Sequence, residues 1–106
     1  MGYYSPDVVS EDVAAENNYS DALSAKGTGP HKVTVSFVED GGTAFNSTVS
    51  IQMKRPEWAS TEWVTVATRT AADVVTLDFA GEMDIRAGIA TGDFGAGTVH
   101  IVIAGG

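Results

Sequence analysis

The chain has 106 residues, enough for one domain with a single core and too few for two comfortable domains. Its 14 acidic and 6 basic residues give a formal net charge of −8, so nucleic acids and anionic membrane surfaces are poor partners. It has no cysteines, which excludes disulfides and thiolate metal sites as sources of stability.

Residues 1–31 differ in composition from the rest of the chain. They are acidic, carry few large aliphatic side chains and end in the breaker sequence Gly-Thr-Gly-Pro at 27–30. We therefore interpret 1–31 as an acidic N-terminal arm, extended or partly helical. Within it, Ser5 followed by Pro6 fits a helix cap and first helical position, which predicts a short helix from there to about Asn17.

From residue 32 onward, apolar residues alternate with polar ones, the pattern of strands with one buried face. We expect the first two such runs to form a hairpin, because the Glu-Asp-Gly-Gly stretch between them is a strong turn signal. The last run is apolar on both faces, so we expect something to cover its outer face. The predicted strands lie at 33–37, 49–53, 63–67, 74–79, 83–90 and 98–104.

Short strands separated by frequent turns predict an all-β domain at 32–106. Its architecture is expected to be an antiparallel β-sandwich of immunoglobulin-like or jelly-roll type. The core should contain the large apolar side chains of the predicted strands, namely Val33, Val35, Phe37, Ile51, Trp63, Leu77, Phe79, Ile85 and Ile101.

The histidines and carboxylates form no recognisable catalytic motif. His31 lies at the end of the arm and His100 within the last predicted strand, and neither stands in a motif that pairs it with a nucleophile. Asp78, Glu82 and Asp84 gather around a glycine turn, but their pattern matches a calcium loop poorly. We therefore expect no enzymatic activity, no cofactor and no metal site.

Several aromatic side chains are candidates for partner binding. Trp58 lies in a predicted loop, and exposed tryptophans are common contact residues in sugar and protein recognition. In the arm, solubility alone does not require Tyr3, Tyr4, Tyr19 and Leu23, so we interpret them as anchors for a partner. An arm with so little apolar surface is expected to be mobile in the isolated subunit and ordered on that partner.

The stretch from Phe45 onward carries several short motifs. They are Thr-Val-Ser-Ile-Gln at 48–52, Trp-Val-Thr-Val-Ala-Thr at 63–68, Arg-Ala-Gly at 86–88, Gly-Asp-Phe at 92–94 and Gly-Thr-Val at 97–99. This stretch resembles small β-sandwich structural proteins of tailed bacteriophages. The resemblance implies a virion component, such as a head decoration (cement) protein or a neck or tail-fibre attachment piece. The acidic arm and the Pro-Glu-Trp sequence at 56–58 depart from the family pattern.

Two functions follow as expectations. The first is a non-enzymatic capsid decoration protein that is made in the bacterial cytoplasm and sits on the capsid surface as a homo-oligomer. It would bind the major capsid protein or other virion proteins and stabilise the shell. A small core without disulfides or metal is only marginally stable alone, so docking would add missing burial. The alternative is a ligand- or carbohydrate-binding module on a phage fibre or adhesin, with Trp58 stacked on a sugar.

Overall fold

A computed structural model describes residues 3–40 and 46–105 of the chain. All regular structure in these residues is β-strand, and no helix long and apolar enough to cross a membrane occurs among them. The strands are β1 (Tyr3–Ser5), β2 (Val8–Val13), β3 (Asn18–Tyr19), β4 (Leu23–Lys26), β5 (Pro30–Asp40), β6 (Val49–Lys54), β7 (Val64–Arg69), β8 (Asp73–Ala80), β9 (Met83–Ile89) and β10 (Thr98–Gly105).

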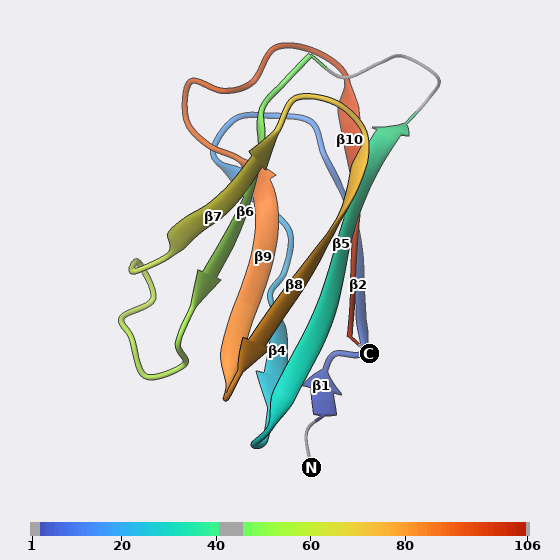
Figure 1. Cartoon of the computed structure of the whole chain (residues 1–106). Helices are drawn as coiled ribbons and strands as arrows, with labels where there is room; N and C mark the ends of the chain where they lie inside the picture. Colours follow the sequence, from blue (N-terminus) through green and yellow to red (C-terminus); the bar gives the residue numbers. More distant parts are fainter. Residues whose placement is uncertain (1–2, 41–45, 106) are drawn as a thin grey trace.

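The strands form two antiparallel sheets that pack face to face (Figure 1). The six-stranded sheet has the order β1-β4-β9-β6-β7, with β3 also paired to β9, and the four-stranded sheet has the order β2-β10-β5-β8. The prediction of an all-β antiparallel sandwich is therefore confirmed. The predicted strands from 49–53 onward correspond to β6 through β10, with ends that agree within two residues.

The core lies between the two sheets and is built from alternate residues of their strands. The central strands β10 and β5 of one sheet contribute valines, isoleucines and a phenylalanine, and β6 and β9 of the other contribute isoleucines together with a valine, a methionine and an alanine. Leu77 and Phe79, which were predicted as core, are only partly buried because β8 is the edge strand of its sheet. The predicted core residues that are buried are Val33, Val35, Phe37, Ile51, Ile85 and Ile101.

The N-terminal segment is extended, but it is not an arm separate from the sandwich. β1 pairs with β4, β4 with β9 and β2 with β10, so the segment contributes strands to both sheets. Val9 and Val13 point into the core while Val8 points to solvent, a strand alternation rather than a helical stripe. The helix predicted from Ser5 to about Asn17 is therefore wrong. The tertiary ladder with β10 satisfies this backbone and buries β-branched side chains that a helix would accommodate less well.

The predicted hairpin between 33–37 and 49–53 is also wrong. β5 belongs to the four-stranded sheet and β6 to the six-stranded sheet, so the chain crosses between the layers here. Both edges of β5 are already occupied, by β10 on one side and β8 on the other. The glycines at 41–42, on which the turn prediction rested, lie outside the described residues.

Candidate functional site

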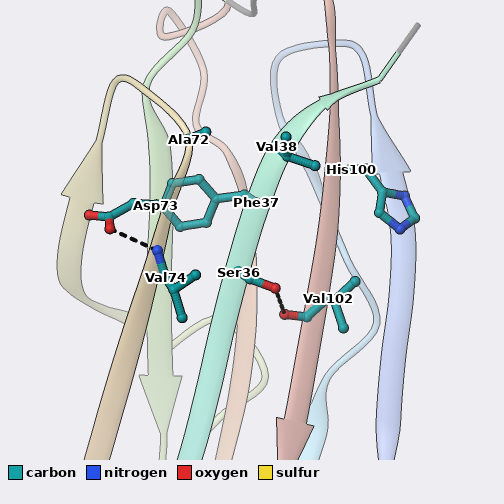
Figure 2. Close-up of a pocket in the computed structure, with 8 residues that line it drawn as sticks. All are labelled: Ser36, Phe37, Val38, Ala72, Asp73, Val74, His100 and Val102. Carbon is teal, nitrogen blue, oxygen red and sulfur yellow. Dashed lines mark hydrogen bonds between the residues drawn. The ribbon is translucent and has the colours of Figure 1, made fainter. Parts of the chain in front are cut away.

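The outer face of the four-stranded sheet carries several valines among its polar side chains. Inward-facing Val33, Val35 and Phe37 alternate along β5 with outward-facing residues that end at Val38, which is 47% exposed. On β8, Val74 is 64% exposed. These strands and β10 border a shallow hollow of about 450 Å³ (Figure 2). The hollow is lined by Ser36, Phe37, Val38, Ala72, Asp73, Val74, His100 and Val102.

The strand register aligns the outward side chains of this face in rows. Val102 of β10 lies opposite Ser36 of β5, and Ser36 lies opposite Val74 of β8. The Ser36 hydroxyl donates to the backbone carbonyl of Val102 at 3.5 Å, as Figure 2 shows, which directs its polar atom into the sheet. The row therefore places a valine on each side of Ser36. A surface of this kind is typical of protein contact sites.

Beside the hollow, the side chains of Ser10, Asp12 and His100 are joined by hydrogen bonds. His100 Nδ1 lies 2.6 Å from Asp12 Oδ1, and His100 Nε2 lies 3.2 Å from Ser10 Oγ. The order of these bonds is that of a Ser-His-Asp triad. No local sequence motif indicates this arrangement, because the partners are 88 and 90 residues apart and only the β2–β10 register brings them together.

The surroundings of these three side chains favour a structural role over catalysis. Ser10 lies in the middle of a regular strand rather than on a tight turn that would project a nucleophile. The side chains of His100 and Asp12 are 38% and 51% exposed, so water screens their interaction. The His100 ring lies on the β2 side of β10, away from the centre of the hollow (Figure 2). The arrangement ties the edge strand β2 to β10.

A second shallow hollow, of about 370 Å³, surrounds Trp58, the tryptophan singled out in the sequence analysis. Trp58 is 45% exposed, in keeping with its position in a loop. The Lys54 ammonium donates to the Trp58 carbonyl at 3.4 Å and holds the loop against β6. Ala59, Glu62 and Val64 complete the lining. An exposed indole and a carboxylate in the lining of one hollow have the chemistry to stack on a sugar and accept its hydroxyl hydrogens.

The predicted anchors of the N-terminal segment have different environments. Tyr3 is exposed on β1 and remains available to a partner. Tyr4 packs against the core, and its hydroxyl lies 3.2 Å from both the carbonyl oxygen and the backbone nitrogen of Lys32. Leu23 is 0% exposed and belongs to the core, so its prediction as a partner anchor is wrong. Its side chain lies between the two sheets because β4 pairs with β9.

Tyr19, the remaining predicted anchor, takes part in an aromatic sandwich on the outer face of the six-stranded sheet. The Arg86 guanidinium carbon lies 3.9 Å from the Tyr19 ring centroid and 4.3 Å from that of Trp63. Arg86 Nε donates to Gln52 Oε1 at 2.9 Å. Partial burial lowers the pKa of Arg86, an effect that Tyr19 opposes. Trp63 is therefore half-buried outside the core, contrary to prediction, because its ring covers Arg86.

The carboxylates considered for metal binding either interact with other groups of the protein or lie on different sheets. Asp84 lies 3.4 Å from the Lys54 ammonium, and Glu82 accepts the backbone N–H of Gly27 at 3.0 Å. Asp78 lies on the other sheet, in β8. Within residues 3–40 and 46–105, no group of three or more His, Asp or Glu side chains is arranged to hold a metal ion.

Comparison with known proteins gives little direct guidance. No protein-family model and no curated protein matches the chain. Among solved structures it is similar to the crystal structure of murine APRIL at pH 8.5, with 10% identity over 96% of this chain and 99% of that chain. The TM-score is 0.37, so the likeness carries no argument about function.

Proposed function

We propose that this chain is a structural protein of a tailed-bacteriophage virion. Its most specific role is that of a capsid decoration protein, which binds the major capsid protein on the capsid surface and stabilises the shell. The protein acts by binding and not by catalysis. The single observation that supports this role best is the aliphatic surface on the outer face of the four-stranded sheet, made by the exposed Val8, Val38 and Val74 and the partly buried Val102.

The energetics of this surface suit docking. Covering a half-exposed valine removes apolar area from water and contributes about 1 kcal/mol for each residue. The carboxylates at the rim of this surface lie beside other polar side chains: Asp12 beside His100, Asp73 beside Arg69 and Asp78 beside Lys32. A complementary surface on the shell would therefore combine apolar side chains with polar groups at its edge.

Attachment to particles that lack the protein tests this proposal. Val38→Asp places a charge in the aliphatic surface and should reduce co-sedimentation with the particles sharply. Val66→Asp is the matched control, because Val66 is 46% exposed, nearly the same as Val38, but lies on β7 of the other sheet. Equal loss of attachment in both variants, or in neither, would contradict docking through the four-stranded sheet.

The Trp58 hollow supports a second candidate, a carbohydrate-binding module on a fibre or adhesin. Trp58 and Glu62 both line this hollow. Titration with polysaccharide from the host surface should quench tryptophan fluorescence if this function holds, and Trp58→Ala should abolish the binding. The decoration role predicts instead that Trp58→Ala leaves attachment to the particle unchanged.

A further inference from the structure

The edge strands of the two sheets are protected to different degrees against pairing with another chain. Natural edges are protected when they are short, charged or bulged. β1 has only three residues, and β2 carries Glu11 and Asp12. β7 contains an extra residue, Val66, where its register with β6 shifts. β8 has eight residues, keeps an unbroken register with β5 and contains neither proline nor glycine.

A hydrogen bond just past the end of β8 shows which backbone groups of this strand point toward β5 and which point away from it. The Gly81 N–H donates to the Gly29 carbonyl at 3.3 Å, so this pair is a hydrogen-bonded one. In an antiparallel ladder such pairs alternate with pairs whose backbone groups point away. Odd-numbered residues of β8 therefore bond to β5. The N–H and C=O groups that point to the open edge belong to Val74, Thr76, Asp78 and Ala80.

Two independent features agree with this assignment. Pro30, which has no N–H, lies opposite Ala80, where the ladder requires no hydrogen bond between the two strands. The Val74 N–H is bonded at 2.7 Å by the carboxylate of its neighbour Asp73, as expected for a group that points away from β5. At the other end of the strand, the Ala80 carbonyl accepts from Arg55 Nη1 at 3.1 Å. Between these two ends, the N–H and C=O groups of Thr76 and Asp78 form a free edge among the residues that the structure describes.

The inward side chains of β8 also lack cover. Val75 and Leu77 are half-buried, although their partners on β5, Val35 and Val33, are 0% exposed. The difference arises because, within the part of the chain that the structure describes, no strand lies beyond β8 in its sheet. One additional strand at this edge would cover Val75, Leu77 and Phe79 and would bond the free backbone groups at the same time.

The charges along β8 are balanced, in contrast to the chain as a whole. Asp73 lies 2.9 Å from Nε of Arg69, and Asp78 lies opposite Lys32 in the register with β5. Two copies that each carry a net charge of −8 repel one another over most of their surfaces. Along β8 this repulsion is locally cancelled, so a second copy can approach here.

We propose that β8 pairs with β8 of a second copy about a two-fold axis, which joins the two four-stranded sheets into one continuous sheet. An antiparallel strand is well suited to pair with itself. With the axis at Leu77, Val75 lies opposite Phe79 of the second copy, an aromatic and β-branched pair. Thr76 then lies opposite Asp78 of the second copy, and no like charges meet. The dimer deepens the proposed function by specifying the homo-oligomer, and it forms without the particle.

The test compares matched proline variants on the two edges of one sheet. Thr76→Pro removes an N–H that points to the second copy and leaves the bonds to β5 in place. Ser10→Pro is the control on β2, where the Gly105 N–H donates to the Asp7 carbonyl, so that the Ser10 N–H also points outward. Each variant is examined by light scattering after size-exclusion chromatography and by analytical ultracentrifugation.

We expect the unaltered protein to have twice the chain mass of 11.0 kDa. Thr76→Pro should raise the dissociation constant by about tenfold or more, because one N–H donor per copy is lost, and Ser10→Pro should leave it unchanged. Hydrogen exchange of the unaltered protein gives a reading that does not depend on variant folding. The amides of Thr76, Asp78 and Ala80 should become protected as concentration rises, while that of Ser10 should not.

The proposal is overturned by a monomer at every concentration, by an assembly that Thr76→Pro leaves intact, or by equal loss in both proline variants. Exchange at Thr76 that does not change with concentration overturns it as well. All these measurements use the isolated protein. A negative result would therefore reject the dimer without bearing on docking to the particle, which is tested separately at Val38.

Discussion

His100 and Asp12 face each other across the β10–β2 pair, with Nδ1 and Oδ1 2.6 Å apart, and Ser10 Oγ lies 3.2 Å from the other ring nitrogen. We nevertheless expect a fluorophosphonate probe to label the protein no faster than its Ser10→Ala variant. Catalysis depends largely on preorganised donors at the oxyanion, and Ser10 lies on an open strand surface. Mass spectrometry of the intact protein measures the labelling. Reaction at Ser10 that His100→Ala abolishes would show that the triad is functional.

Removing residues 1–26 should unfold the protein. The deletion takes away β1, β2, β3 and β4. It leaves the backbone edges of β10 and β9, which pair with β2 and β4, without partners. A mobile arm would instead leave the melting temperature nearly unchanged. Circular dichroism during heating distinguishes the two, and a cooperative transition retained at the original temperature would contradict the strand pairing described here.

Core substitutions should cost more at the centre of the sheet than at its edge. Ile101→Ala on β10 removes a side chain with 0% exposure, so its cost should be about 2–5 kcal/mol. Leu77→Ala on β8 should cost clearly less, because that side chain is only partly buried. Urea unfolding of both variants, at a concentration low enough to keep the protein monomeric, gives the comparison. The reverse order in the monomer would contradict the partial burial of Leu77 on an edge strand.

Asp73 should contribute to the acid dependence of stability. The Val74 N–H and then Arg69 lower the pKa of Asp73 from its ordinary value of 3.8. Because the folded-state pKa is the lower one, the stabilisation is fully present above pH 3.8 and is lost as pH falls through the folded-state pKa. The stability difference from Asp73→Asn should therefore shrink below pH 3.8. A carboxyl pKa above 3.8 in an NMR titration would contradict the contact.

Arg86→Lys should destabilise the protein although the charge is kept. The planar guanidinium covers both Tyr19 and Trp63, whereas an ammonium cannot stack on two rings. The expected cost is about 0.5–2 kcal/mol, measured by chemical unfolding. In a Trp58→Phe background, fluorescence reports on Trp63 alone, and its emission should shift to longer wavelength. No shift would mean that Arg86 does not shield Trp63.

The sequence predicted the strands whose side chains alternate strongly and missed those that are short. β6 through β10 have clear apolar alternation, so their positions could be read directly. β1, β3 and β4 have only two to four residues each, too few for a period to be seen. Ser5 and Pro6 also imitate a helix start. Local signals therefore outweighed the weak alternation of Val9 and Val13.

Strand pairing accounts for the rest of the difference between prediction and structure. The hydrogen-bonded group of Ser10, Asp12 and His100 depends on the register of two strands at opposite ends of the chain, which no local pattern encodes. Trp63 was expected in the core because aromatic residues usually are, but the partner that covers it, Arg86, comes from a distant strand. Trp58 was found from the sequence because exposure in a loop is a local property.

The position of β10 has a consequence for how the protein is made. β10 is the last strand of the chain, yet it lies between β2 and β5, with Val99 paired to Val13. A ribosome releases β2 long before β10, so the four-stranded sheet lacks its middle strand until β10 has also emerged. Such high contact order predicts folding on the order of milliseconds to seconds after that point. In that interval the valines of β2 and β5 are open to neighbouring chains, and the yield of folded protein depends on how quickly the final strand inserts between them.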